Sequence, residues 1–281
     1  MPLILVTNDD GITANGIRAL VEVARELGDV LVVAPDSPQS AQGHAITIEV
    51  PVFLRETSVF DDLENVRAYE CSGTPVDCVK LAKSVLLRDQ PADLCVSGIN
   101  HGGNAASNIL YSGTMSAAME AALEGVPSIG FSLLDFMPDA DFDPTKVYAR
   151  RLMRYVLENG MPTGNLWNVN VPNLPLDQLR GLKICRQGDA RWVEEYREAQ
   201  DPRGRTYYWL TGRFVNEDDR PDTDIAALDA GYLSLVPCHH DLTDYASYER
   251  LAENRAELET PADPAAATAD GPVGEQRLEQ F

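Results

Sequence analysis

Two adjacent carboxylates near the start of the chain, Asp9 and Asp10, are the first side chains in the sequence that could do chemistry. Neighbouring carboxylates repel each other unless a proton or a cation neutralises them. A hard divalent cation takes oxygen ligands, and Ser40 and Asn100 offer neutral oxygens in two other polar segments. These residues predict a metal site. An Asx turn with a helix cap would also explain Asp-Asp-Gly taken alone, and an ordinary turn would explain Ser40.

The segment Ser112-Gly113-Thr114 precedes an alanine-rich stretch with helical character. Free backbone N–H groups and the helix dipole favour an anion at such a position. Serine or threonine is also the usual N-cap of a helix, and one residue can fill both roles. Carboxylates, neutral oxygens and an anion-binding helix start suit a metal-assisted attack on a phosphate ester. His101 lies in a polar loop and is left outside this core mechanism.

The elements that must position these residues follow an alternating pattern. Short apolar runs typical of buried strands occur at 3–7, 30–34, 93–97, 128–131 and 166–171. Helical spacing occurs between them, at 17–27, 75–87, 115–124 and 146–157. This order predicts a Rossmann-like, doubly wound α/β domain with a mainly parallel sheet over about residues 1–175. In such sheets ligands bind beyond the carboxyl ends of the strands, where the polar segments lie.

The pattern changes after residue 172. Residues 182–186, 192–197 and 205–210 have the character of strands with no helix between them, which predicts a projecting β-hairpin arm. Arms of this kind often pair with a second subunit. A short helix at 223–228 and a returning strand at 232–236 follow. Earlier in the chain, alternating apolar residues over 44–55 predict a longer strand with two unlike faces.

We therefore expect one α/β domain over residues 1–251, with its core at about 1–175 and the hairpin arm and return at about 176–251. Residues 252–281 hold seven acidic and two basic residues and lose the hydrophobic pattern. This composition predicts an acidic disordered tail.

The chain has 44 acidic residues against 23 lysines and arginines, giving a net charge of −21. Such a field disfavours nucleic-acid polymers and anionic membranes as partners. The chain has only four lysines, Lys80, Lys83, Lys146 and Lys183. An acidic, lysine-poor surface is typical of a protein working in concentrated salt, although an acidic cytosolic enzyme is the simpler interpretation. Five cysteines without a CxxC motif indicate free thiols, and the absence of a leader or membrane span predicts a cytoplasmic protein.

In these motifs the chain resembles the SurE family (survival protein E), whose members are described as metal-dependent 5′/3′-nucleotidases. The resemblance covers about residues 3–245 and rests on the segments LILVTNDDGI, VVAPDSPQS, TIEV, CSGTPVDCVKLA, DLCVSGINHGGN, ILYSGTMSAAMEA, WNVNVP and DTDIAALDAGYLSLVP followed by HHDLT. The double aspartate, the SGIN loop and the YSGT helix start are together highly specific.

The resemblance implies a ligand set for one divalent cation per subunit, Mg²⁺ or Mn²⁺, made by Asp9, Asp10, Ser40 and Asn100. It also implies a phosphate-binding set made by Asn104, Ser112, Gly113 and Thr114. Asp9 and Asp10 are the expected catalytic residues, and either could be the general base. The roles of His239 and Asp241 in the HHDLT segment stay open.

Two segments depart from the family pattern. Residues 12–16 lack the proline that often precedes the glycine, and residues 105–108 replace a common Leu-Gly-Asp-Asp-like run. The second change removes acidic residues near the mouth of the pocket and therefore concerns substrate preference.

The resemblance implies a phosphomonoesterase that hydrolyses nucleoside 5′- and 3′-monophosphates by metal-assisted attack of water, with exopolyphosphatase activity as a further expectation. It also implies a homodimer or homotetramer assembled through the C-terminal arm. Two alternatives are a nucleotide-sensing or assembly protein without hydrolysis, and a phosphatase that forms a phospho-aspartyl intermediate. The second usually carries Asp-x-Asp, whereas the aspartates here are adjacent.

Overall fold

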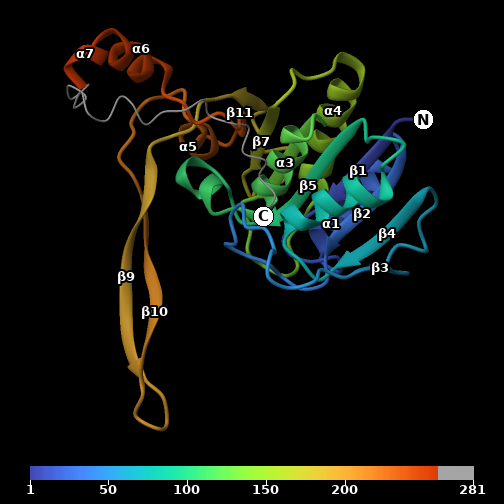
Figure 1. Cartoon of the computed structure of the whole chain (residues 1–281). Helices are drawn as coiled ribbons and strands as arrows, with labels where there is room; N and C mark the ends of the chain where they lie inside the picture. Colours follow the sequence, from blue (N-terminus) through green and yellow to red (C-terminus); the bar gives the residue numbers. More distant parts are fainter. Residues whose placement is uncertain (259–281) are drawn as a thin grey trace, which may run out of the picture. The chain divides into compact units, whose positions relative to one another are not determined.

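A mostly parallel β-sheet forms the centre of this computed structural model, which describes residues 1–258 (Figure 1). The strands of the sheet, in chain order, are β1 (Leu3–Thr7), β2 (Asp29–Pro35), β3 (Leu54–Glu56), β4 (Val66–Cys71), β5 (Leu94–His101), β6 (Ser128–Leu133), β7 (Asn165–Val171), β8 (Leu182–Ile184) and β11 (Leu233–His239). Their spatial order is β3-β4-β2-β1-β5-β6-β7-β11-β8. The six strands β4-β2-β1-β5-β6-β7 of this spatial order are parallel to one another. β3 runs antiparallel to its neighbour β4, and β11 runs antiparallel to its neighbour β7.

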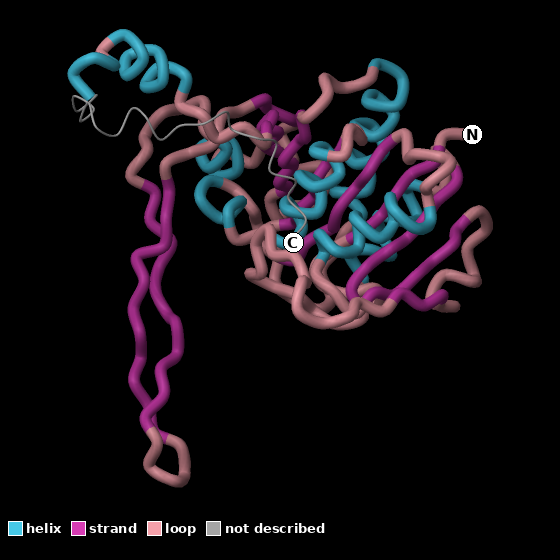
Figure 2. Tube along the Cα trace, in the orientation of Figure 1, coloured by secondary structure: helices cyan, strands magenta, loops and turns pink. Residues whose placement is uncertain are grey.

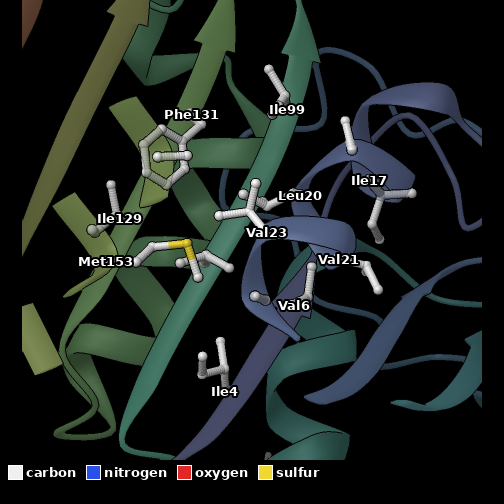
Figure 3. Packing of buried hydrophobic residues seen from close by; sticks show 14 of the residues in the cluster. Ile4, Val6, Ile17, Leu20, Val21, Val23, Ile99, Ile129, Phe131 and Met153 are labelled. Carbon is white, nitrogen blue, oxygen red and sulfur yellow. The ribbon is translucent and has the colours of Figure 1, made fainter. Parts of the chain in front are cut away.

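Helices cover both faces of the sheet, as the alternating sequence pattern predicts. One hydrophobic cluster joins the sheet to α1 (Asn15–Ala24) and α4 (Asp143–Asn159). A second cluster joins the other face to α2 (Pro75–Leu81) and α3 (Gly113–Leu123). Strand β1 contributes alternate side chains to the two clusters, as the pleat of a strand requires. Ile4 and Val6 pack in the first (Figure 3), and Leu3 and Leu5 pack in the second.

The doubly wound fold expected from the sequence is confirmed, and it fixes where a ligand would bind. From β1 the chain proceeds outward through β2 to β4, and it then returns to the other side of β1 with β5. The strand order therefore reverses between β1 and β5. Ligands of such folds bind at the carboxyl ends of the strands beside this reversal. Asp9 and Asp10 follow β1 directly, and Asn100 lies near the end of β5.

The long strand predicted over residues 44–55 is wrong. Only its end forms the short β3, and the preceding residues form no strand. Thr47 directs its backbone N–H (3.1 Å) and its hydroxyl (2.6 Å) to the carboxylate of Asp77 in α2. Pro51 has no N–H to donate to a neighbouring strand. The alternating apolar residues that suggested a strand are exposed in the described structure, namely Ile46, Ile48 and Val50.

One strand was missed by the sequence analysis. β4 pairs in parallel with β2, and its burial pattern is irregular, with Ala68 and Cys71 buried and Arg67 exposed. Its six residues include two charged side chains, Arg67 and Glu70, so neither a continuous apolar run nor strict alternation marks it. Helix α2 continues into a π-helical turn, Ala82–Leu86, which agrees with the predicted helical limit near residue 87.

The predicted arm is a two-stranded antiparallel hairpin that is separate from the main sheet (Figure 2). The first of the three predicted arm strands, at 182–186, is not part of it, because Leu182–Ile184 pairs with β11 as β8 of the main sheet. The strands of the hairpin, β9 (Ala190–Gln200) and β10 (Thr206–Asn216), are longer than the sequence pattern indicated. They pair with each other over their full length, from Ala190 opposite Asn216 to Gln200 opposite Thr206. Helix α5 (Asp224–Asp229) then leads into β11, which returns to the sheet.

The described residues divide into two compact units at residues 240 and 241. The second unit contains α6 (Tyr245–Glu253) and α7 (Arg255–Leu258). The predicted disordered tail over 252–281 therefore begins with residues that are helical, while residues 259–281 lie outside the described part of the chain. The predicted domain limit at residue 251 stays a prediction. Within residues 1–258, no helix is long and apolar enough to cross a membrane.

Gly16 allows the first turn of α1 to approach β5 closely, and this contact supports a further prediction. A Cβ atom at Gly16 would lie 1.9 Å from the backbone oxygen of Ile99. Because a backbone carbonyl cannot rotate away as a side chain can, Gly16→Ala should lower the free energy of unfolding by about 1–3 kcal/mol. Urea denaturation would measure this change, with Asn15→Ala at the exposed neighbouring position as the control. Equal stability of the two variants would contradict the expected clash.

Candidate functional site

A cavity of about 620 Å³ opens at the carboxyl ends of β1 and β5, where the fold predicts a ligand. Six of the residues predicted from the sequence line this cavity together: Asp9, Asp10, Ser40, Asn100, Asn104 and Ser112. They come from segments that are far apart in the chain. The other two predicted residues, Gly113 and Thr114, are buried beside Asp9 and do not line the cavity.

Asp9 is held in a nearly closed environment. Asp9 is only 5% exposed, and its Oδ1 accepts a hydrogen bond from the hydroxyl of Thr114. Gly113 allows this close packing, since a Cβ atom there would lie 2.7 Å from Cβ of Asp9. The pKa of Asp9 is raised to about 6, and burial of the carboxyl group is the largest cause. The hydrogen bond from Thr114 lowers this pKa, and the negative charge of Asp10 raises it.

Asp10 is partly buried, and it lies against the loop that follows β5. Its Oδ2 accepts a hydrogen bond of 3.3 Å from the backbone N–H of His101. Burial raises the pKa of Asp10 above its usual value. The ring of His101 packs edge-on against Phe142 with 5.1 Å between ring centroids, and its Nδ1 is buried without a hydrogen-bond partner in the described structure.

The loop that carries Ser40 is tied to both neighbouring parts of the site. The backbone N–H of Gln39 donates to the carbonyl oxygen of Asp9 at 2.7 Å, and that of Gly43 donates to Tyr111 at 3.1 Å. These bonds hold the Ser40 hydroxyl at the cavity. Near the end of β5, Nδ2 of Asn100 donates to the carbonyl oxygen of Gly102 at 2.7 Å. This bond leaves Oδ1 of Asn100 as the oxygen that is available to a ligand in the cavity.

This donor set fits a hard divalent cation. The two carboxylates accept hydrogen bonds from an uncharged hydroxyl and an uncharged backbone N–H, so those bonds leave two adjacent negative charges uncompensated. Burial of such charges is costly unless a cation is bound. In the described residues no group of three or more histidine, cysteine, aspartate or glutamate side chains could hold a metal. A cation here would therefore need neutral oxygens as well, and Ser40 and Asn100 are placed at the same cavity.

Asn104 is fixed by a network of buried asparagines. Its backbone N–H donates to Oδ1 of Asn170 at 2.7 Å, its carbonyl accepts from Asn168 at 2.8 Å, and its Nδ2 donates to the hydroxyl of Ser132 at 2.8 Å. Asn170 in turn donates to Asn168 at 2.9 Å. Because each bond satisfies a buried polar group, the network sets one orientation for Asn104.

The asparagines of the WNVNVP segment were not among the expected site residues. Asn168 and Asn170 are two residues apart in β7, so they point to the same face of the sheet. Their exposures are 2% and 0%. Two polar residues on one face of a strand whose other interior residues are apolar are the signal that could have identified them as supports of a site.

The start of α3 joins the phosphate-side residues to the cavity. Ser112 is the N-cap, and its Oγ accepts from the backbone N–H of Met115 at 3.0 Å while the residue also lines the cavity. The N-cap interpretation of Ser112 is therefore confirmed, while its anion-binding role stays a prediction. Gly113 and Thr114 occupy the first turn of α3, where the backbone N–H groups have no partner within the helix. The side chain of Thr114 is used to hold Asp9.

A buried carboxylate that the sequence analysis did not single out, Asp224, connects the site to the base of the hairpin. Its Oδ2 accepts from the backbone N–H of Ala106 at 2.8 Å, and its Oδ1 accepts from Gly188 at 2.9 Å and Ile225 at 2.8 Å. Asp224 is 0% exposed. It therefore fixes the loop after Asn104 against residues that precede β9.

A second buried carboxylate, Glu120, holds the loop beyond Ser40 against α3. Its two oxygens contact Nζ of Lys80 at 2.5 Å and Nε2 of His44 at 2.8 Å. Glu120 is 4% exposed. Burial opposes its ionisation, but the bonds from His44 and Lys80 prevail and hold the pKa of Glu120 below its usual value.

Comparisons with known proteins show what the whole chain is similar to. The family model described as "Survival protein SurE" matches residues 4–194. A protein of Christiangramia forsetii named 5′-nucleotidase SurE is 57% identical over 242 residues, which cover 86% of this chain and 92% of that protein. A protein of Flavobacterium johnsoniae with the same name is 54% identical over 250 residues, covering 89% of this chain and 95% of that protein.

A solved structure gives the same result for the fold. The crystal structure of the SurE protein from Aquifex aeolicus is similar with a TM-score of 0.77 and 36% sequence identity. The similarity covers 92% of this chain and 100% of that chain.

Proposed function

The chain belongs to the survival protein SurE family, and from this premise we propose that it is a divalent-metal-dependent phosphomonoesterase. Its substrates would be nucleoside 5′- and 3′-monophosphates, and exopolyphosphatase activity is a further activity to test. The observation that carries the proposal is the meeting of Asp9, Asp10, Ser40 and Asn100 with the start of α3 at one cavity. The names of the relatives from C. forsetii and F. johnsoniae support the nucleotidase activity.

In this proposal Asp9, Asp10, Ser40 and Asn100 hold one cation, Mg²⁺ or Mn²⁺. A bound divalent cation acts as a Lewis acid on a phosphate oxygen and lowers the pKa of water. Asp9 and Asp10 are the candidates for the general base that accepts the proton of the attacking water. Thr114 keeps the Asp9 carboxylate in place through its hydroxyl.

The phosphoryl group would be bound by the start of α3 and by Asn104. Ser112 would contribute from the cavity wall, while Gly113 and Thr114, which do not line the cavity, would act through the dipole of the first helical turn. These donors and the helix dipole would stabilise negative charge that develops on the phosphoryl oxygens. Asn104 is held in one orientation by its buried network, so it would not need to reorganise during the reaction.

We also propose that the hairpin of β9 and β10 assembles the chain into a homodimer or homotetramer. Large apolar and aromatic side chains on the hairpin are exposed in the single chain: Trp192, Val193, Tyr196, Tyr207, Tyr208, Trp209 and Leu210. Exposed patches of this kind mark interaction surfaces.

Phosphate release from a panel of nucleoside 5′- and 3′-monophosphates and from polyphosphate tests the proposed function. The assay would contain Mg²⁺, Mn²⁺ or a chelator, each at low and at molar salt. We expect release that requires metal. Activity confined to molar salt would support the high-salt interpretation of the acidic surface. Tight nucleotide binding without release from folded protein would instead favour a sensing role, and a trapped phospho-enzyme would favour a phospho-aspartyl mechanism.

A further inference from the structure

Three aromatic side chains line the same cavity as Asp9 and Asp10, yet the proposed hydrolysis makes no use of them. They are Tyr111, Phe136 and Trp192. Each is exposed, at 55%, 81% and 47% respectively. Aromatic rings at the wall of a polar cavity are the usual means of binding a planar ring by stacking.

Trp192 is the best-fixed of the three. Its indole N–H donates to Oδ1 of Asn108 at 2.8 Å, and its ring packs against Phe214 on the opposite strand with 5.7 Å between centroids and 60° between planes. The hairpin is thereby attached to the loop that follows Asn104. A ring already held from two sides loses little conformational freedom when a ligand stacks on it.

Phe136 lies directly over the loop that carries the proposed cation and phosphate ligands. A Cβ atom at Gly102 would lie 2.3 Å from the ring of Phe136, so the ring rests on the backbone at this position. Gly102 separates Asn100 from Asn104 in the sequence. The aromatic wall therefore adjoins the polar part of the cavity, and the cavity volume of about 620 Å³ suits one nucleotide-sized ligand.

The charges of the cavity restrict what could occupy the aromatic part. Among the described residues, the lining includes the carboxylates of Asp9 and Asp10 but no lysine or arginine. A second phosphate group would have no cationic side chain to bind there, whereas an uncharged aromatic ring would need none. This favours the base of a nucleoside monophosphate over further phosphate groups of a polyphosphate.

We propose that Trp192, with Phe136 and Tyr111, binds the base of a nucleoside monophosphate by stacking and so determines the preference for nucleotides over other phosphate esters. This inference rests on the proposed phosphomonoesterase function. Since every base offers an aromatic face, stacking should be tolerant of base identity.

The test compares two substrates that share a phosphate ester but differ in the base. For a nucleoside 5′-monophosphate, Trp192→Ala should raise KM by about tenfold or more, which is the scale of base–aromatic stacking. For ribose 5-phosphate, KM and kcat should stay unchanged. Trp192→Phe keeps an aromatic face but loses the bond to Asn108, and it should retain most of the affinity for the nucleotide. The increase in KM caused by Trp192→Ala should be similar for purine and pyrimidine nucleotides.

Trp209→Ala is the matched control, because Trp209 is an exposed tryptophan of the same hairpin that does not line the cavity. Because Trp209 also belongs to the hairpin surface proposed for assembly, the variant and wild type are compared at equal oligomeric mass, measured by light scattering, and both KM values should then be unchanged. An equal effect of Trp192→Ala on both substrates, or no effect on either, would overturn the proposed platform.

The failure of the proposed function would look different. In that case wild-type protein releases phosphate from neither substrate, and equilibrium dialysis with a nucleoside monophosphate decides the inference. Binding that Trp192→Ala weakens and Trp209→Ala does not would support the platform. Unchanged binding in both variants, or no binding by the wild type, would overturn it.

Discussion

Asp9→Asn is expected to reduce phosphate release strongly and, at the same time, to stabilise the metal-free protein. The pKa of Asp9 rises from 3.8 to about 6 mainly because the carboxylate is buried. A rise of about two units corresponds to a cost of about 3 kcal/mol for holding the charged form in the folded state. Asparagine keeps an oxygen that can accept the bond from Thr114 but carries no charge. Without a metal ligand and proton acceptor, turnover should fall by about 10²- to 10³-fold or more.

The pH dependence of this stabilisation follows from the direction of the pKa shift. Because the folded protein binds the proton of Asp9 more tightly than the unfolded chain does, the cost is absent below about pH 4. It develops as the pH rises from 3.8 to about 6 and is fully present above that. Denaturation of the metal-free proteins should therefore give a higher free energy of unfolding for Asp9→Asn than for wild type at pH 8. This difference should disappear near pH 4.

Asp36→Asn is the control for this prediction, because Asp36 is an exposed aspartate near the same end of the sheet and does not line the cavity. It should change neither the activity nor the stability appreciably. Added Mg²⁺ or Mn²⁺ should raise the melting temperature of wild type and of Asp36→Asn but not that of Asp9→Asn. A metal-free Asp9→Asn protein that is less stable than wild type at pH 8 would contradict the expected burial cost.

The second large effect, on stability and activity, is expected when the buried carboxylate of Asp224 is replaced. Its carboxylate accepts backbone bonds from Ala106, Gly188 and Ile225 with both oxygens. An asparagine has one oxygen, so its amide group would face at least one backbone N–H that needs an acceptor. A buried donor without a partner costs about 1–3 kcal/mol. Asp224→Asn should therefore lower the free energy of unfolding by at least that amount and reduce activity by loosening the loop after Asn104.

Asp222→Asn provides a matched control two residues away. Asp222 pairs with Arg186 at 2.9 Å, but its side chain is 64% exposed. Exposed ion pairs contribute about 0–1 kcal/mol. Urea denaturation should separate the two variants clearly, and hydrogen exchange at the amide of Ala106 should increase only in Asp224→Asn. Equal unfolding free energies would show that the buried carboxylate does not hold the loop.

The parts of the fold that the sequence predicted well are those in which local pattern and burial agree. The apolar runs of β1, β2 and β5 are buried on both faces, as strands of a covered parallel sheet must be. Thr74 and Asp77 form a capping box at the start of α2, and Ser112 caps α3, so these helix starts are encoded within four residues. Such signals need no knowledge of distant segments.

The errors arose where distant partners decide the structure. The apolar alternation over 44–55 favours a strand, but Asp77 of α2 takes the hydrogen bonds of Thr47. β4 became a strand because β2 offers it an edge, although its own residues lack a strand pattern. Local propensity is a weak guide when packing and hydrogen bonding of remote residues compete with it.

The sequence by itself determined the family and the residue types of the candidate site, because Asp9-Asp10 and Ser112-Gly113-Thr114 are contiguous motifs at the ends of recognisable elements. Only the tertiary structure decided how these residues are used. It placed the Thr114 hydroxyl on Asp9, and it placed Trp192 of the hairpin at the cavity. The reason is physical: burial, pKa shifts and hydrogen bonds depend on which atoms surround a side chain, and those atoms come from segments that only the folded chain brings together.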